Sequence, residues 1–363
     1  MNVIGCDFHT RRQQIAMVNR QTGEVMEGCL HHQGSREVEE FYSALQGPTV
    51  VGIESTGYAI WFHELLDRLG IELRVGDAAR IRAQQVRKKK TDKEDARLIL
   101  RLLLEERFPS IWVIDPAGRD LRLILNQRMR LVRTRTRVKN ALQSLALNHR
   151  LALGSKLFTA KGREAFRQLK MRRWARSNSQ ELWQWLEWLH PRIRHLDQVI
   201  EKAARSRPEA RRLLSYPGVG PNTALATVLV LGPVERFARA GQVSSYLGLV
   251  PAESSSGQRR QLGRITKQGS TLLRYLMVQA AHSAARHEPD LKRIYRRLVA
   301  RRGLQVAKTA VARKLCEHLY VLLRDEIDYA EFRRRRSSRG ACLQKSVTRS
   351  GHAQGRKLTE PTA

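Results

Sequence analysis

The chain of 363 residues carries 67 lysines and arginines against 34 aspartates and glutamates, a formal net charge of +33, and we expect a protein this basic to act on nucleic acid. An anionic membrane surface is the usual alternative, but no stretch reaches the roughly 20 apolar residues of a spanning helix, and polar residues interrupt the N-terminus where a signal peptide needs an apolar core. The 4 cysteines have neither metal-ligand nor redox spacing, so we expect a cytoplasmic protein whose cysteines are reduced and structural.

The first third of the chain alternates between short strands and amphipathic helices. Gly23 marks a hairpin turn between two of the strands, and Gly70 ends a helix. Three strands followed by alternating helix and strand predict a mixed-sheet α/β domain over residues 1–115. The expected strands are 3–7, 14–18, 25–30, 49–53 and 71–75, and the expected helices are 36–45 and 58–69.

Four carboxylates stand at the ends of these elements. Asp7 and Glu54 each follow an apolar strand, and Asp92 and Asp95 open the helix that continues into the apolar run 98–104. A spacing of three places the two helical aspartates on one face. Taken singly, a carboxylate at a strand end is ordinary and an aspartate at a helix start is more often a cap. Together they predict a site for a divalent metal such as Mg²⁺.

Asp7 has a second interpretation, because the phosphate loop of the actin and sugar-kinase fold also opens with a strand that ends in aspartate. In that loop glycine and threonine or serine normally follow the aspartate, so that phosphate can approach the backbone. Here Phe8 and His9 occupy those positions, which counts against a phosphate loop.

The middle segment, residues 116–207, is predicted to be helical. One long helix is expected over 120–150, with apolar residues every seven positions and cationic residues between them, which suits either a coiled-coil seam or a solvated helix packed on its own domain. A second seam follows the irregular stretch 152–180, and Pro191 within it predicts a kink or two helices. Three tryptophans beside it are expected to pack rather than to stack on bases. The two seams predict two antiparallel helices or a dimer built from them. Their apolar positions are Ile124, Leu131, Val138 and Leu145, then Leu182, Leu186, Leu189, Ile193, Leu196 and Ile200; the tryptophans are Trp183, Trp185 and Trp188.

The third segment, residues 208–330, is expected to be mostly helical. Residues 214–224 have the form of a helix-hairpin-helix turn, whose backbone amides can face a DNA phosphate, although a plain glycine turn between helices has the same spacing. The segment 331–363 begins with the basic run Arg333 to Arg336 and is rich in serine, glycine and threonine, so we expect disorder and nonspecific nucleic-acid affinity there.

Residues 253–269 form a polar, glycine-punctuated stretch with three adjacent serines. Composition alone favours a flexible surface loop. A serine that attacks phosphorus would need nearby cations or a metal to stabilise the developing charge, and the stretch supplies candidate cations: Arg259, Arg260, Arg264 and Lys267.

The order of these motifs resembles the DEDD transposases of bacterial insertion sequences, the IS-one-ten family, which includes the Piv-type invertases. The likeness runs from about residue 3 to residue 325. It is carried by Asp7, Glu54-Ser-Thr-Gly-Tyr58, Lys90-Thr-Asp-Lys-Glu-Asp-Ala96, Pro217-Gly-Val-Gly220, Tyr246-Leu-Gly-Leu-Val-Pro251, Ser255-Ser-Gly257 and Gly263-Arg-Ile-Thr-Lys-Gln-Gly269.

The resemblance implies a RuvC-like (RNase H fold) catalytic domain, a coiled-coil dimerisation region and a transposase domain at 208–330. It assigns the Mg²⁺ ligands to Asp7, Glu54, Asp92 and Asp95. It assigns the nucleophile that forms a phosphoserine with DNA to Ser256, before Gly257, with Ser255 as the alternative register. Relatives use a bridge RNA that pairs with donor and target DNA, and their dimers join into a tetrameric synapse in which one subunit's serine completes another's acidic site.

Three functions therefore remain to be separated. The first is an RNA-guided serine recombinase that transposes an insertion sequence or inverts DNA. The second is a metal-only, junction-resolving nuclease whose serine loop merely binds DNA. The third is a nucleic-acid-binding protein without catalysis, which four matched carboxylates disfavour.

Overall fold

The computed structural model describes residues 1–33, 36–85, 91–255 and 261–336. The chain separates into two compact units, the first spanning Met1–Val113 and the second beginning at Ile114. The sequence had placed the end of the first domain at residue 115. Within the described residues, no helix is both long and apolar enough to span a membrane.

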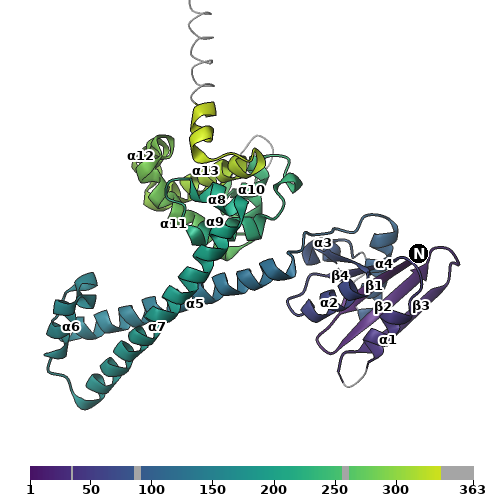
Figure 1. The fold of residues 1–363 in the computed structure, drawn as a ribbon, viewed down its shortest axis with the longest axis horizontal. Coiled ribbons are helices and arrows are strands. Elements are labelled where there is room, and N and C mark those ends of the chain that lie inside the picture. The colour runs from purple at the N-terminus through teal and green to yellow at the C-terminus, as the bar shows by residue number, and fades with distance from the viewer. Residues whose placement is uncertain (34–35, 86–90, 256–260, 337–363) are drawn as a thin grey trace, which may run out of the picture. The chain divides into compact units, whose positions relative to one another are not determined.

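The first unit is built on a five-stranded mixed sheet with the strand order β3-β2-β1-β4-β5. The hairpin strands β1 (Asn2–Phe8), β2 (Arg12–Asn19) and β3 (Val25–His31) pair antiparallel, whereas β4 (Thr49–Glu54) and β5 (Glu72–Gly76) continue the sheet in parallel with β1. This is the RNase H-like arrangement, and it confirms the predicted mixed-sheet fold (Figure 1).

Alternation along β1 sends its side chains to two different cores. Ile4, Cys6 and Phe8 join the cluster covered by α1 (Glu37–Ala44) and α2 (Ile60–Arg68). Val3 joins the opposite cluster, which is covered by α4 (Asp92–Leu104). Because side chains alternate with a period of two, Gly5 and Asp7 face α4 as well. A short helix absent from the sequence-based prediction, α3 (Ala78–Ala83), adds Ile81 to this second cluster.

Two glycines let α4 lie directly against the sheet. Gly5 and Gly52 are paired on the neighbouring strands β1 and β4. A Cβ atom on Gly5 would lie 2.3 Å from both Ala96 O and Leu100 N, so at this point the helix backbone touches the strand backbone. A Cβ on Gly52 would lie 2.7 Å from Leu103 Cδ1. At Gly5 only glycine fits, because the atoms it meets are helix backbone, whereas at Gly52 the contact is with the side chain of Leu103.

The second unit begins with a helical arm made of α5 (Pro116–Asn148), the 3₁₀ helix η1 (Gly154–Phe158), α6 (Ala160–Arg167) and α7 (Arg173–Ser206). Helices α5 and α7 pack side by side and are joined through η1 and α6 (Figure 1). The predicted two-helix pairing is thus formed within one chain. An ion pair of 2.8 Å between Arg128 and Asp197 also links the two helices.

The heptad predicted for α5 describes only part of its buried face. Val138 is buried, but its buried partners are Leu142 and Ala146 rather than Leu145, which is partly buried. A straight helix drifts away from a strict seven-residue repeat, so the contact with α7 follows spacings of four instead. In α7 the predicted seam is confirmed at Leu186, Leu189, Ile193 and Ile200, which are buried, while Leu182 and Leu196 are half-buried.

Two expectations for α7 are corrected. Pro191 does not divide the helix in two, because Leu189 and Ile193 on either side of it are buried in the seam and hold one helix through residues 173–206. Trp183 packs in the arm core as expected. Trp185 and Trp188, however, are 56% and 51% exposed, because their positions turn away from the seam.

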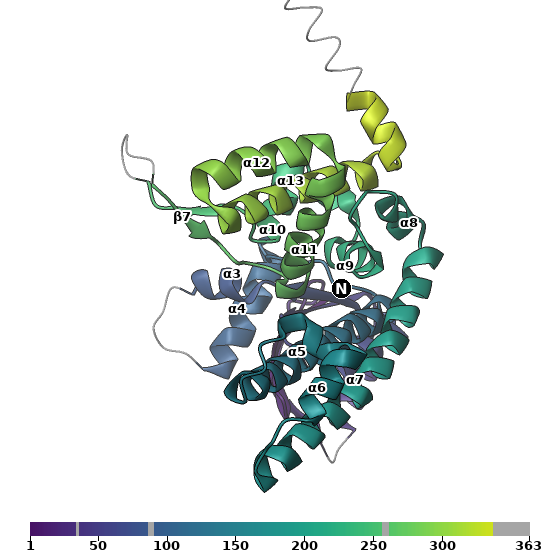
Figure 2. The ribbon, with the colours of Figure 1, turned by 90° about the vertical axis from the view of Figure 1, so that its left-hand side faces the viewer.

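The remaining described residues form a mostly helical body, as predicted, in which α13 packs between α11 and α12 (Figure 2). It also contains a short β-hairpin that the sequence-based prediction lacked.

The glycine turn before α9 packs inward: Gly218 has φ of 87°, and a Cβ there would lie 2.4 Å from Ala284 N. At Gly218 the structure therefore shows a structural turn between helices. The elements are α8 (Pro208–Leu214), α9 (Pro221–Leu231), η2 (Val234–Arg236), α10 (Ala240–Tyr246), β6 (Pro251–Glu253), β7 (Leu262–Ile265), α11 (Thr271–His287), α12 (Pro289–Arg302) and α13 (Leu304–Arg324).

The expectation of disorder after residue 331 is wrong for its first residues. Residues 329–336 are helical, and three of the four arginines form ion pairs with acids of the body, among them Arg335 with Asp325 at 3.9 Å. Arg333 donates to Glu288, which is fully buried, at 3.0 Å, and Arg336 donates to Asp290 at 2.8 Å. The acids that anchor them are distant in sequence, so composition alone could not reveal the pairing. The rest of the predicted tail, 337–363, lies outside the described residues.

The close approach of α4 to β1 yields a prediction. Gly5→Ala forces a Cβ into backbone atoms that cannot move without displacing α4, so we expect the free energy of unfolding of the full chain to fall by about 3 kcal/mol. Denaturant titration measures the loss. The matched control is Gly28→Ala on β3, where the new Cβ would meet only Ile15, with Cγ1 at 3.7 Å, and stability changes by less than about 1 kcal/mol. Equal stability of the two variants would contradict the packing argument.

Candidate metal centre and serine hairpin

Three elements of the first unit bring its carboxylates to one end of the sheet. Cys6 on β1 pairs with Ile53 on β4, so Asp7 and Glu54 are the next residues along two adjacent parallel strands. At the start of α4 it is Thr91, and not an aspartate, that caps the helix, since its hydroxyl accepts from the Glu94 amide at 3.3 Å. Helix capping, the ordinary interpretation of Asp92 and Asp95, therefore does not account for them.

The centre of the site is a cluster of Asp7, His9 and Asp92, whose potential ligand atoms all lie within 4.8 Å of one another. The Nε2 atom of His9 lies 3.0 Å from Asp7 Oδ2 and 3.5 Å from Asp92 Oδ2. The Asp7 side chain is 13% exposed and that of Asp92 is 39% exposed, so the cluster opens to solvent on the Asp92 side. The structure thus brings together two of the four predicted acids and adds a histidine.

The two aspartates have opposite electrostatic environments. Burial raises the pKa of Asp7, with further contributions in the same direction from the negative charges of Asp95 and Asp92, against the lowering effect of His9. The hydrogen bond from Arg12, at 3.0 Å, lowers the pKa of Asp92. A cation bound at this point would relieve the repulsion that Asp7 feels from the helical acids.

The other two predicted acids border the cluster without joining it. Glu54 forms an ion pair with Arg82 of α3 at 3.8 Å. Asp95 accepts a hydrogen bond from Gln85 Nε2 at 3.0 Å, and its charge acts on Asp7. Among the described residues, neither belongs to the group of atoms close enough to share one ion.

His9 is the residue that the sequence-based assignment missed. In the sequence it served only as an argument against a phosphate loop at Asp7. It follows β1, two positions after Asp7, and its backbone N–H donates to Arg12 O at 3.0 Å across the turn into β2. A histidine two residues after a strand-end aspartate was a usable signal, because such a turn can fold the ring back over the carboxylate.

The donor set at this cluster fits a divalent cation. Carboxylate oxygens are the ligands that Mg²⁺ and Mn²⁺ prefer, and an imidazole suits Mn²⁺ and later transition metals better than it suits Mg²⁺. Asp7 and Asp92 would supply the oxygens, and His9 the nitrogen. The geometry supports a metal site of this kind, while the predicted choice of Mg²⁺ stays a prediction.

The serine stretch belongs to the second unit and flanks a two-stranded hairpin rather than a plain loop. Strands β6 and β7 pair antiparallel, and Ser254 N donates to Gln261 O at 3.0 Å beyond them. Ser255 Oγ donates to Glu253 at 2.8 Å and accepts from the Gln261 amide at 3.2 Å. Ser255 therefore ties the hairpin together. Arg264 and Lys267 are exposed, and Ser256, Gly257, Arg259 and Arg260 lie outside the described residues.

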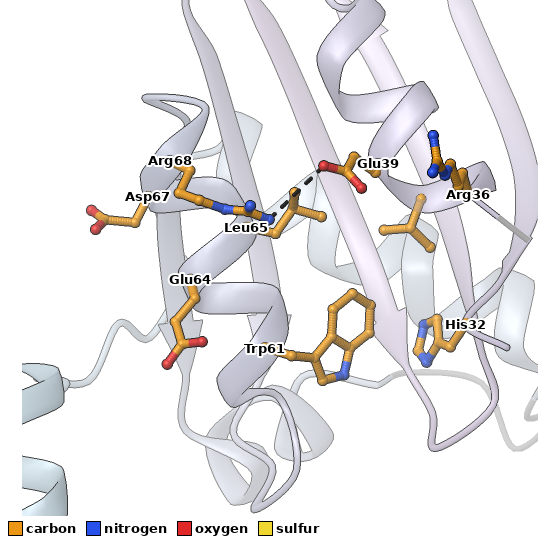
Figure 3. A pocket seen from close by; sticks show the side chains of 9 residues that line it. His32, Arg36, Glu39, Trp61, Glu64, Leu65, Asp67 and Arg68 are labelled. Atoms are coloured by element: carbon orange, nitrogen blue, oxygen red, sulfur yellow. Dashed lines mark ion pairs between the residues drawn. The ribbon is translucent and has the colours of Figure 1, made fainter.

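A separate hollow of about 640 Å³ lies on the α1 and α2 side of the first unit (Figure 3). Trp61 and His32 border it at one end, and an ion pair of 4.0 Å between Arg68 and Glu39 crosses it. None of Asp7, Glu54, Asp92 and Asp95 is among its lining residues. The chemistry predicted from the sequence therefore belongs to the end of the sheet and not to this hollow.

Comparison with known proteins matches both parts of the chain to transposases. Residues 4–149 match the DEDD transposase model of the IS110 type, and residues 210–296 match the transposase model of the IS116/IS110/IS902 family. A probable family 20 transposase of Pseudomonas aeruginosa is 28% identical over 340 residues, which cover 90% of this chain and 98% of the relative. The transposase for insertion sequence element IS1111A of Coxiella burnetii is 28% identical over 258 residues, covering 67% of this chain and 69% of its own length.

Both matched segments have the folds described above. The first spans the mixed sheet and the acidic cluster, and the second spans α8 to α12 with the serine hairpin. The predicted family is thereby confirmed, and with it a DNA-processing activity. The chain belongs to the IS110/IS116/IS902 family of insertion-sequence transposases, with a DEDD domain at its N-terminus.

Proposed function

We propose that this transposase cuts and rejoins DNA strands with a divalent metal held by its acidic cluster and a serine nucleophile. The metal part of this proposal is supported by the convergence of Asp7, His9 and Asp92 at one end of the sheet. Glu54 and Asp95 stand at the edge of that cluster, one held by Arg82 and the other bonded by Gln85.

In this proposal the acids would hold the ion, and the bound ion would attract the DNA phosphate. Asp7 and Asp92 would contribute oxygens, and Glu54 and Asp95 could join them if Arg82 and Gln85 released their side chains. A bound divalent cation would polarise the phosphate and stabilise the charge that develops on its oxygens. The guanidinium of Arg12, which now donates to Asp92, is placed to move to a phosphate oxygen instead.

We assign the nucleophile to Ser256. Its oxygen forms a bond to phosphorus while the bond from phosphorus to the leaving deoxyribose oxygen breaks, and that oxygen takes up a proton to become a hydroxyl. The product is a phosphoserine, and a second DNA hydroxyl later attacks its phosphorus. The bond from phosphorus to the serine oxygen then breaks, and the serine takes up a proton to become a free hydroxyl again. The hydrogen bonds of Ser255 support this register, because both its donor and its acceptor capacity already hold the hairpin.

We further propose a bridge RNA and a homodimer that pairs into a tetrameric synapse, as the family resemblance implies. The net charge of +33 supports simultaneous binding of RNA and DNA. On the helical arm, the exposed Trp185 and Trp188 line an apolar hollow of about 480 Å³. A second copy of the chain that covered this hollow would bury both rings, which favours a dimer formed through the arm.

The metal proposal predicts how individual acids affect ion binding. We expect Asp7→Asn and Asp92→Asn each to weaken binding of Mn²⁺ to the full chain by at least about 10-fold, because each removes one charged ligand. Isothermal titration measures the change without requiring DNA or activity. Asp67→Asn, an exposed acid on α2 outside the cluster, serves as the control and leaves the affinity unchanged. If Asp7→Asn binds Mn²⁺ as tightly as the unmodified chain, the cluster is not the metal site.

The serine proposal predicts a covalent intermediate. Protein, transcript of the flanking DNA, Mg²⁺ and labelled donor and target duplexes are mixed and run on a denaturing gel. We expect a protease-sensitive protein–DNA adduct that disappears in Ser256→Ala and in Asp7→Ala but persists in Ser255→Ala. Because Ser255 supports the hairpin, its variant should form less adduct without losing it.

The same gel separates the alternatives. DNA that is cut without an adduct, and that both serine variants still cut, would identify a metal-only, junction-resolving nuclease. An adduct that forms equally well without the transcript would remove the bridge RNA from the mechanism. Inverted rather than transposed products would identify a DNA invertase.

A further inference from the structure

A cationic cleft lies on the helical arm of the second unit, and its lining shares no residue with the acidic cluster or the serine hairpin. Its volume is about 340 Å³, and it is formed where α5 meets the 3₁₀ helix η1. One wall is Phe158, which packs on the arm core and over which Lys139 Nζ lies 4.6 Å from the ring centroid. The remaining lining residues are cationic or neutral hydrogen-bonding side chains: Arg135, Thr136, Asn140, Gln143 and Ser155.

The positive charge at this cleft is not balanced by the acids nearby. Arg135 and Lys139 stand four apart on α5, an arrangement of like charges that costs helix stability. Among the described residues, neither one forms an ion pair with an acid. Three of the four acids of α7 are committed to other arginines: Asp197 to Arg128 and Glu201 to Arg205, both at 2.8 Å, and Glu187 to Arg163.

Burial and the crowding of positive charge at the cleft lower the pKa values of two side chains there. Burial lowers the pKa of Lys139, and the positive charge of Arg135 lowers it further. Burial likewise lowers the pKa of His190 on α7, with added repulsion from Lys139, Arg135 and Arg194. Four cationic or titratable side chains from two helices therefore share one region and repel each other. An anion seated among them would relieve that repulsion.

We propose that this cleft binds a phosphate of a nucleic-acid backbone. Arg135 and Lys139 supply the charge, and the side-chain amides of Asn140 and Gln143 supply neutral hydrogen-bond donors to the remaining phosphate oxygens. The hydroxyl of Thr136 already donates to Val132 O at 2.9 Å, so it lines the cleft without donating to the phosphate. The Phe158 wall keeps the lysine stem in place and gives the adjoining sugar an apolar contact. A phosphate contact of this kind fixes the position of the arm on the backbone without choosing a sequence.

The test uses the full chain and compares two double variants with the same loss of charge. Arg135→Ala/Lys139→Ala removes the cleft cations. Arg130→Ala/Arg133→Ala removes two arginines of α5 that do not line the cleft. Fluorescence anisotropy measures binding to a DNA duplex and to an RNA hairpin over a series of salt concentrations, and thermal unfolding confirms that both variants are folded.

We expect the cleft variant to lose at least about 10-fold in affinity and to reduce the salt slope by about 1 for each phosphate that the protein no longer neutralises. The control should lose less than a third as much. The probe that is affected more, DNA or RNA, identifies which backbone the cleft holds. Lys139→Met, which keeps the apolar stem over Phe158, should reproduce part of the loss at unchanged stability. Equal losses in the two double variants, or none in the cleft variant, would overturn the proposal.

Discussion

The contact between the backbones of β1 and α4 at Gly5 determines the geometry of the acidic cluster at the end of the sheet. Helix α4 can lie 2.3 Å from the position of a missing Cβ only because the residue there is glycine. Two positions further along the same face of β1 stands Asp7, and the first turn of α4 carries Asp92 and Asp95. A side chain at Gly5 would lift the helix and separate the carboxylates that we propose as metal ligands. The site therefore depends on packing in the sheet core as much as on the acids themselves.

Carboxylates this close together repel one another, and basic side chains of the same chain offset their negative charge. His9 lies against Asp7, Arg12 donates to Asp92 and Arg82 pairs with Glu54. These partners are exposed and can leave at little cost, since pairs of this kind contribute only about 0–1 kcal/mol each. They reduce repulsion among the acids in the folded protein, and in the proposed mechanism they are the groups free to turn toward a DNA phosphate. The buried Asp7 is the exception, because desolvation raises its pKa and makes it the acid that gains most from a cation.

The parts of the structure that follow from local periodicity could be predicted from the sequence. The short apolar runs at residues 3–7 and 49–53 indicated strands, and each of these runs leads into an acid, Asp7 or Glu54. The spacing of Asp92 and Asp95 revealed a helical face. What the sequence could not supply depends on contacts that local spacing does not encode: the folding of His9 onto Asp7, and the pairing of Arg333 with the buried Glu288. The exposure of Trp185 and Trp188 also escaped prediction, because a tryptophan beside a seam has the same sequence pattern whether it packs or faces solvent.

The basic residues of the C-terminal helix and those of the arm cleft have different physical roles. In the C-terminal helix, Arg333 and Arg336 are paired with buried or half-buried partners. Arg336, which can only donate, contacts His318 Nε2 at 2.7 Å. His318 must then carry its proton on Nδ1 and donate it to Tyr216 at 2.8 Å, which agrees with a pKa lowered to about 3 by burial and by Arg336.

This network joins the last described helix to the turn before Gly218 and uses the basic residues as structural elements. Cations at the arm cleft, by contrast, crowd together without acidic partners among the described residues. Uncompensated charge in a defined cleft raises the free energy of the unbound protein, and such a cost is recovered only when a polyanion binds. The net charge of the chain is therefore a poor guide to where nucleic acid binds. The informative quantity is the charge left over after each ion pair within the fold has been assigned.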